Sequence, residues 1–492
     1  MTLHEELEKE FDNVISRFKC DEIILTPFFN IGKNVPENLQ QYKRFEKRKN
    51  RFFFTSYKFK YIFRLALIVS RALIHHIYWF SDYEKFLLKL PKVSKQVFLS
   101  HFTGIFNQLN ESDRYFGEII KKRKILKEKN LILLINHTRK IPKRKNKSKL
   151  LSESIYLILP KTTDTKTVWQ IFVKQFQNFN YILHLSRKHG EIHRDERIFI
   201  YELAIQQLSQ SALSQQILFS NLSYVIAKGN TKELHLTYEG HSYETYLARK
   251  IQSKFRNILV NVYQFAPIVP SQISFFKNIE RLPKSINIHV TGKSIVREIV
   301  RMTRILPNEI NIKGSSKNKE KINVIKLKKH KKFTVIFAPE GLQDSFFEFM
   351  ELAAMCAQHL TNCRIVIRAH PDTLKNNSQM LNRIMLKNSN LIFSNQTLEH
   401  DLSESTVCVY RSSAVGIQGL QYGVIPIHFS KFKDGSVDPI SFEDLKHLRL
   451  NESETLIHAI KAYISMPDKK LLKLQCSFPK VFEKYFARLS MK

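Results

Sequence analysis

Residues 407–429 read VCVYRSSAVGIQGLQYGVIPIHF, and this stretch decides the fold class. It begins with a short apolar run typical of a buried strand. It continues through residues 414–422 with helical spacing and ends in a second apolar run over residues 424–429. A strand, a helix and a strand in this order predict a βαβ unit, in which the two strands are parallel.

The same alternation continues upstream of this unit. Short apolar runs at residues 333–338, 364–368 and 390–393 predict three further strands, and residues 346–360 have the periodicity of a helix. The C-terminal part of the chain is therefore predicted to contain a parallel sheet covered by helices.

The preceding part of the chain has the same pattern. Residues 233–238 (ELHLTY), 258–265 (ILVNVYQF) and 286–290 (INIHV) predict strands, and residues 243–255 predict the helix between the first two. We therefore expect an α/β protein with two Rossmann-like domains that face a central cleft. In such sheets, ligands bind beyond the carboxyl ends of the strands.

Two basic, polar tracts divide the chain. The tract at residues 139–149 (RKIPKRKNKSK) lies between two strand-like runs and predicts a loop insertion within a domain. The tract at residues 311–332 holds Gly-Ser-Ser and many lysines, and it predicts a flexible linker. The expected domains are therefore residues 1–310 and residues 333–492.

The composition narrows the classes of function. The chain has 492 residues, of which 43% are apolar and 12% aromatic, and this excludes a wholly disordered or fibrous protein. The net charge of +35, from 79 Lys and Arg against 44 Asp and Glu, favours polyanionic surroundings such as nucleic acid, anionic lipid or phosphorylated substrates. The five cysteines include no CxxC pair, which argues against a disulfide framework or a zinc ribbon. The charged start MTLHEELEKEF does not predict secretion.

The most apolar long stretch is at residues 63–80 (FRLALIVSRALIHHIYWF). Two arginines and two histidines interrupt it, and each central arginine costs about 2.5–3.5 kcal/mol in a spanning helix. We therefore interpret the stretch as a core helix. The alternative is a helix that lies on a membrane, because residues 43–64 alternate basic and aromatic side chains.

The first candidate for chemistry follows the strand at residues 233–238. Glu239 and Gly240 come where the apolar alternation stops, and a partly shielded carboxylate at a strand end can act as a general base. The alternative is that Glu239 only caps the next helix. We interpret Glu244, on that helix, as a helix-face residue.

The second candidate is the pair His370-Pro371, which follows the run at residues 364–368. An imidazolium at this position could neutralise or protonate a leaving phosphate. Pro371 fixes the backbone beside it, and Arg368 adds a permanent positive charge. The alternative is a turn histidine without a chemical role.

The third candidate is Arg411-Ser412-Ser413, between the strand and the helix of the opening stretch. Either serine can cap the helix, and Gly423 can end it. The N–H groups of a helix N-terminus, together with the two hydroxyls, can also bind phosphate, and capping uses the same geometry. Both interpretations remain open.

Two weaker candidates complete the set. Glu340-Gly341 follows the run at residues 333–338 and could line the floor of the cleft, and Asp438 in the turn SVDPIS could close over a nucleotide. Ordinary turn chemistry also explains both.

In three motifs the sequence resembles a known group of enzymes. Glu239-Gly240, His370-Pro371 and Ser412-Ser413 are similar to the motifs of the bacterial sialyltransferases, polysialyltransferases and Kdo transferases. These are glycosyltransferases of GT-B fold that use CMP-activated sugars. Residues 409–429 also look like the nucleotide-binding end of GT-B enzymes of surface-polysaccharide synthesis. The likeness covers residues 230–430 and departs at Tyr238, where the family has a second acidic residue.

The resemblance implies a metal-independent glycosyltransferase without a cofactor. Glu239 would deprotonate the acceptor hydroxyl, and His370 would stabilise or protonate the departing CMP phosphate. Ser412, Ser413 and Arg411 would bind that phosphate. The remaining residues implied at the nucleotide site are Arg368, Pro371, Glu340 and Gly341.

The resemblance also implies the reactants and the place of action. The donor sugar would be a nonulosonic acid such as sialic acid or Kdo, and the acceptor a capsular or lipopolysaccharide glycan. The domain of residues 1–310 would lie on the acceptor side, and that of residues 333–492 would bind the nucleotide sugar. The basic charge would hold a cytoplasmic enzyme at the inner face of the cell membrane.

Three alternatives remain open. One is a UDP-sugar, GDP-sugar or polyol-phosphate transferase of GT-B fold. Another is a nucleic-acid-binding protein, although the sequence has no recognition module and we expect no specific nucleic-acid partner. The last is a non-catalytic, membrane-bound scaffold of a polysaccharide assembly complex.

Overall fold

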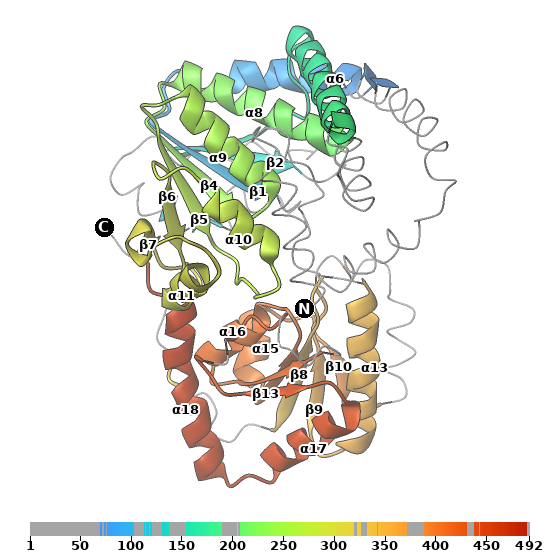
Figure 1. Ribbon diagram of the computed structural model, residues 1–492. Coiled ribbons are helices and arrows are strands. Elements are labelled where there is room, and N and C mark those ends of the chain that lie inside the picture. Colours follow the sequence, from blue (N-terminus) through green and yellow to red (C-terminus); the bar gives the residue numbers. More distant parts are fainter. Residues whose placement is uncertain are drawn as a thin grey trace. The chain divides into compact units, whose positions relative to one another are not determined.

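The computed structural model describes most of the chain beyond residue 68 (Figure 1). The described residues are 69–489, except for 71–72, 75, 103–112, 114, 118, 121–129, 137–153, 189–203, 205–206, 319–321, 326–331, 342, 371–372, 374–387, 431–436 and 442. The predicted loop insertion at residues 139–149 and the residue Pro371 lie outside the described residues.

The chain divides into two compact units. The N-terminal unit consists of Met1–Phe265, Gln272–His289 and Met302–Asn311. The C-terminal unit consists of Ala266–Ser271, Val290–Arg301 and Ile312–Lys492.

The N-terminal unit is built on a seven-stranded sheet with the order β3-β2-β1-β4-β5-β6-β7. All pairs from β3 to β6 are parallel. The strands are β1 (Gln96–Phe102), β2 (Asn130–Asn136), β3 (Ser154–Ile158), β4 (Glu233–Tyr238), β5 (Leu259–Gln264), β6 (Asn287–Val290) and β7 (Ile310–Ile312). This is the order of a doubly wound Rossmann sheet, in which the direction of winding reverses between β1 and β4.

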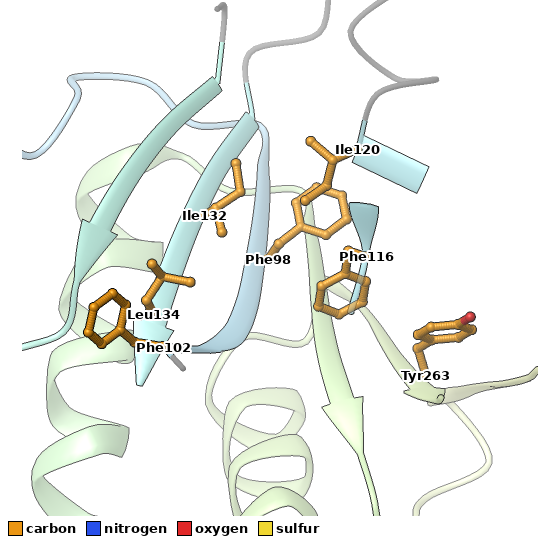
Figure 2. Close-up of a cluster of buried hydrophobic side chains, with 7 residues drawn as sticks. All are labelled: Phe98, Phe102, Phe116, Ile120, Ile132, Leu134 and Tyr263. Atoms are coloured by element: carbon orange, nitrogen blue, oxygen red, sulfur yellow. The ribbon is translucent and has the colours of Figure 1, made fainter. Parts of the chain in front are cut away.

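Helices cover this sheet, and α9 and α10 lie along it in Figure 1. Besides a helix over residues 76–89, the helices are α6 (Thr165–Lys188), α8 (Gln210–Gly229), α9 (Ser242–Lys254), α10 (Ile273–Glu280) and the short 3₁₀ helix η2 (Pro307–Glu309). One core cluster joins side chains of β1, β2 and β5 to the segment that follows β1 (Figure 2). Its members are Phe98, Phe102, Phe116, Ile120, Ile132, Leu134 and Tyr263.

The C-terminal unit is built on a six-stranded sheet with the order β10-β9-β8-β11-β12-β13, and every neighbouring pair is parallel. The strands are β8 (Thr334–Ala338), β9 (Arg364–Ile367), β10 (Leu391–Phe393), β11 (Val407–Tyr410), β12 (Ile425–Phe429) and β13 (Leu448–Leu450). Here the winding reverses between β8 and β11. The prediction of an α/β protein with two Rossmann-like domains is therefore confirmed.

Six helices surround this second sheet among the described residues. They are α11 (Lys293–Met302), α13 (Gln343–His359), α15 (Leu398–Glu404), α16 (Val415–Gln421), α17 (Ser453–Ile464) and α18 (Asp468–Tyr485). The long α18 packs on α16, the helix that follows Ser412 and Ser413 in the chain.

The strand predictions succeed because buried parallel strands are continuous apolar runs. The structure differs from the sequence analysis in one boundary and in one strand. Asn311 and Ile312, placed at the start of the linker of residues 311–332, belong to β7. The central strand β1 was not predicted, although its sequence QVFLSHF is largely apolar.

The prediction that residues 63–80 form a core helix is wrong for the described part, which begins at residue 69. Ile74 is 67% exposed and Ile77 is 76% exposed, whereas His76 and Tyr83 are buried. Only one side of this helix contacts the unit, so its other apolar side chains face solvent. No helix among the described residues has the length and apolar character that a membrane span requires.

Candidate functional site

The N-terminal sheet brings polar side chains together where its winding reverses. His101 lies near the carboxyl end of β1, and Thr237 lies near the end of the neighbouring β4. His101 Nε2 is 3.2 Å from the Thr237 hydroxyl and 3.3 Å from the Tyr243 hydroxyl at the start of α9. Doubly wound sheets bind their ligands at this edge, so it is the first candidate site.

Glu239 follows β4 directly at this edge, and Gly240 makes the turn into α9. Gly240 has a φ of +81°, which an L-residue rarely adopts, and a Cβ there would lie 2.3 Å from the Cα of Phe275. Glycine at this position therefore allows α10 to pack directly against the turn between β4 and α9. The backbone is also held from outside, because Gln272 donates to the Glu239 carbonyl and Asn278 donates to the Gly240 carbonyl.

The Glu239 side chain is 17% exposed and lies against a histidine. Its Oε2 is 3.2 Å from Nε2 of His241, which is the N-cap residue of α9. The N-cap position itself is occupied by His241, and the Glu239 carboxylate contacts the ring of this residue. An ionised carboxylate accepts from the imidazole, and the pair can hold or move a proton at this position.

Glu244, which we interpreted as a helix-face residue, is buried and contacts the turn before α9. It is 2% exposed, and its Oε2 accepts hydrogen bonds from the backbone N–H groups of Glu239 (2.8 Å) and His241 (2.9 Å). This is the carboxylate half of a capping box. Burial raises the pKa of Glu244 to about 7, and the adjacent Glu239 charge adds to the rise, while His241 opposes it.

The C-terminal sheet assembles a second group at its own reversal point. Glu340 and Gly341 follow β8, and Arg411 follows the adjacent β11. The Arg411 guanidinium bonds to Glu340, with Nε 2.5 Å from Oε1, and its Nη1 lies 3.6 Å from a carboxylate oxygen of Glu348 on α13. Arg411 therefore joins the two strand ends, and its charge is shared between two carboxylates.

His370 belongs to this second group through Gly341. A Cβ on Gly341 would lie 2.9 Å from Nδ1 of His370, so the imidazole fills the space that the missing side chain leaves. The backbone carbonyl of His370 accepts from the N–H and from the hydroxyl of Thr373. The exposed imidazole thus lies at the carboxyl edge of the sheet, between the ends of β8 and β9.

Ser412 and Ser413 lie half-buried beside Arg411. The predicted helix 414–422 is observed as α16, with Ala414 as its N-cap residue. The Ser413 hydroxyl accepts from the Val415 N–H at 3.3 Å, so it has a capping contact. The end of the helix was predicted correctly, because Gly423 has a φ of +68°.

Arg368 points to a different partner. Its Nη1 is 2.5 Å from Oδ2 of Asp401 on α15, and it also donates to the Gln396 carbonyl. Asp401 is 7% exposed, so this ion pair secures α15. The guanidinium therefore holds α15 and the Gln396 carbonyl beside the end of β9.

Asp438 is not a lid over a nucleotide, because it is 2% exposed. It accepts from the Tyr410 hydroxyl at 3.0 Å and from Arg449 Nε at 2.8 Å, and it lies 2.7 Å from His447 Nε2. Burial alone would raise the pKa of Asp438, but the hydrogen bond from His447 and the nearby positive charges hold it below its ordinary value. The network anchors Tyr410, the last residue of β11.

Sequence reasoning missed three residues of the first group: His101, His241 and Glu244. The run at residues 97–102 would have placed His101 at a strand end. The spacing of three residues between His241 and Glu244 is that of a capping box, although histidine replaces the usual serine or threonine. Within the described residues, no cluster of three or more His, Cys, Asp and Glu side chains could hold a metal ion.

Comparisons with solved structures find likenesses over most of the chain. It is similar to a glycosyltransferase from Rickettsia africae, with 12% identity and a TM-score of 0.43, over 80% of this chain and 94% of that one. It is also similar to a UDP-GlcNAc 2-epimerase from Neisseria meningitidis bound to UDP-GlcNAc (10% identity, TM-score 0.46, 79% and 97% covered). A third is an alpha,alpha-trehalose 6-phosphate synthase from Burkholderia multivorans (10% identity, TM-score 0.45, 79% and 96% covered). No protein-family model and no curated protein sequence match the chain. With identities and TM-scores this low, the function has to be argued from the chain's own residues.

Proposed function

We propose that the chain is a glycosyltransferase that moves a sugar from a nucleotide donor to a surface-glycan acceptor. The donor in this proposal is a CMP-activated nonulosonic acid such as sialic acid or Kdo. One observation carries the proposal: in each Rossmann-like sheet, polar and ionisable side chains gather at the reversal point of the winding. These side chains are His101, Glu239 and His241 in one unit, and Glu340, His370 and Arg411 in the other.

The N-terminal unit acts on the acceptor in this proposal. Glu239 accepts the proton of the attacking hydroxyl, as a general base does. Its carboxylate is partly exposed, and His241 Nε2 donates to it from 3.2 Å. Because Glu244, Gln272 and Asn278 hold the backbone of the turn, the carboxylate is presented in a fixed direction, which lowers the entropic cost of reaction.

The C-terminal unit binds the donor in this proposal. His370, as an imidazolium, neutralises or protonates the departing phosphate, and Ser412 and Ser413 donate hydroxyl hydrogen bonds to it. Arg411 bonds to Glu340, so in this proposal it keeps the ends of β11 and β8 together below the donor. Glu340 Oε2 is buried without a hydrogen-bond partner among the described residues, and it could accept from a hydroxyl of the donor.

The proposal includes a place of action. The net charge of +35 would keep a cytoplasmic enzyme at the anionic inner face of the cell membrane, where it would meet a lipid-linked or membrane-proximal glycan. The same charge would attract acidic donors and growing acidic glycans.

A donor screen tests the nucleotide. CMP is expected to raise the melting temperature of the chain, and UDP and GDP are expected not to do so. The variant His370→Ala should lose much of the CMP effect, while the control His458→Ala, an exposed histidine on α17, should keep it. If UDP or GDP raises the melting temperature and CMP does not, the donor is a UDP-sugar or GDP-sugar, which is one of the alternatives left open by the sequence.

A transfer assay with a CMP-sugar separates the two roles. Glu239→Gln should keep the CMP-induced shift in melting temperature but lose transfer about 100-fold or more, as removal of a general base does. The control is Glu309→Gln, next to the edge strand β7 of the same sheet. Wild-type transfer by both Glu239→Gln and His370→Ala would remove the catalytic assignment and favour a scaffold.

A further inference from the structure

Helix α6 has a buried apolar side and, in addition, exposes several large apolar side chains. Val168, Ile171, Phe179 and Ile182 form its buried side, and Ile171 packs against Leu213 and Ile217 of α8. This side alone would attach α6 to the N-terminal unit. A surface helix of a water-soluble domain normally carries polar residues on its remaining side.

The outward side of α6 carries four large apolar or aromatic side chains among polar ones such as Gln170, Gln177 and Asn180. Trp169 is 67% exposed, Val173 42%, Phe176 43% and Tyr181 44%. Their spacing of four, three and five residues keeps them on one side of the helix. An exposed apolar patch of this kind marks a binding surface for a partner or a membrane.

The charge of α6 points to the class of partner. Thr165–Lys188 contains no Asp or Glu, and Lys166 and Lys174 lie exposed on the same side as Trp169 and Val173. Aromatic and aliphatic side chains bordered by lysine are typical of helices that lie in the interface of an anionic bilayer.

Further exposed apolar side chains lie on the helix over residues 76–89 and on the helical residues 73 and 74 before it. His76 connects this helix to α6, because its ring nitrogens lie 2.8 Å from the Thr162 hydroxyl and 3.0 Å from the Thr165 hydroxyl at the start of α6. Figure 1 shows this helix in blue beside α6. The large exposed side chains are Leu73 (52%), Ile74 (67%), Ile77 (76%) and Tyr78 (67%).

We propose that the outward side of α6 and residues 73–78 form a docking surface for an anionic lipid bilayer. A second copy of the chain would bring the same lysines against this surface without carboxylates to pair with them. Lipid phosphates would pair with the lysines, and the region below the headgroups would take up the aromatic side chains.

The two tryptophans of the chain make the test direct. Trp79→Phe leaves Trp169 as the sole tryptophan. With vesicles of phosphatidylcholine and phosphatidylglycerol, its emission should shift to the blue, and brominated lipid should quench it. Vesicles of phosphatidylcholine alone should have a much smaller effect. The double variant Trp169→Ser/Phe176→Ser should bind the anionic vesicles more weakly by about tenfold or more, because each large side chain loses its burial energy.

Matched controls separate the surface from general effects. Leu306→Ser removes another exposed apolar side chain of the same unit, 58% exposed, and should leave vesicle binding unchanged. Lys166→Glu/Lys174→Glu should weaken binding far more than Lys469→Glu/Lys473→Glu on α18, which changes the net charge by the same amount.

Several outcomes would overturn the proposal. One is a Trp169→Ser/Phe176→Ser variant that binds vesicles as tightly as wild type. Another is an equal loss of vesicle binding in the lysine variants of α6 and of α18. A Trp169 that acrylamide cannot reach in the absence of lipid would mean that another segment of the chain covers this surface. A dimer that this variant abolishes would identify a second copy as the occupant. The assay uses no nucleotide or sugar, so its result is independent of the proposed glycosyl transfer.

Discussion

The carboxylate of Glu244 accepts a hydrogen bond of 2.8 Å from the backbone N–H of Glu239, so one acid side chain fixes the backbone that carries the other. Glu244 is buried, and Glu239 is partly exposed. The buried acid therefore determines the direction in which the accessible acid points. This relationship explains why α9 begins so abruptly after β4, and it can be tested through its pH dependence.

We expect Glu244→Gln to remove a pH dependence of stability. Burial raises the pKa of Glu244 from its ordinary value of 4.5 to about 7 in the folded protein. The folded chain then holds this proton more tightly than the unfolded chain. The free energy of unfolding therefore falls as the pH rises from about 4.5 to about 7, by about 3 kcal/mol. Glutamine can still accept the backbone hydrogen bonds, but it has no proton to lose.

Urea unfolding at pH 5 and pH 7.5 measures this difference. The control Glu309→Gln also replaces a carboxylate that accepts a backbone N–H, at Leu306, but lies at the surface. It should keep the wild-type difference between the two pH values. A Glu244→Gln variant with the same difference as wild type would show that this carboxyl group does not titrate in that range.

The contact between Gly341 and His370 predicts a variant that separates activity from stability. Alanine at position 341 would place its Cβ 2.9 Å from His370 Nδ1, and the exposed imidazole would have to move aside. Because a side chain at the surface can change rotamer freely, the free energy of unfolding should change by about 1 kcal/mol or less. The efficiency of transfer should fall about tenfold or more, since His370 leaves its position for the phosphate.

The measurement compares kcat/KM and melting temperature of Gly341→Ala with those of Gly229→Ala. A Cβ at position 229 would lie 3.3 Å from the Cβ of Ser94, away from both candidate groups. Full transfer activity in Gly341→Ala would show that the orientation of His370 is not important.

The sequence predicted most of the strands, because a buried parallel strand is apolar along its whole length. It could not predict the partners of charged residues. Arg411 and Glu340 are 71 positions apart and meet only because the sheet places β11 beside β8. Glu244 has the spacing of a helix-face residue, and only the position of α9 against the end of β4 buries it. The periodicity of residues 63–80 likewise could not tell a buried helix from one whose apolar side faces solvent.

The ion pair between Asp444 and Arg297 predicts how the stability of the C-terminal unit changes in acid. Asp444 accepts from Ser294 and Arg297 of α11 (both at 2.6 Å) and from Lys484 of α18 (3.2 Å). Burial opposes its ionisation, but these partners lower its pKa to about 2. Asp444→Asn should therefore cost about 2 kcal/mol of stability at pH 7, because the partly exposed Arg297 loses its strongest partner but keeps Glu298 and Glu443 nearby.

This cost should diminish as the pH falls from about 4 to about 2. The carboxylate stabilises the fold above its ordinary pKa of 3.8, and that stabilisation is lost as the folded protein takes up the proton. Urea unfolding of wild type and Asp444→Asn at pH 7 and pH 2.5 tests the convergence. Equal costs at both pH values would contradict it.

The Tyr410–Asp438 hydrogen bond predicts a link between a buried network and the binding of the donor. Tyr410 ends β11 and directly precedes Arg411 and the two serines in the chain. Its hydroxyl donates a hydrogen bond of 3.0 Å to Asp438. Tyr410→Phe keeps the ring but removes this bond, so stability should fall by about 2 kcal/mol, as for a hydrogen bond to a charged group. The turn of residues 411–413 then loses its anchor, and the CMP-induced shift in melting temperature should decrease. Tyr463→Phe on α17, a partly buried tyrosine elsewhere in this unit, is the control and should keep the full shift. If Tyr410→Phe keeps it as well, the network stabilises the sheet without positioning the turn, and the serines must be held by α16 and α18 alone.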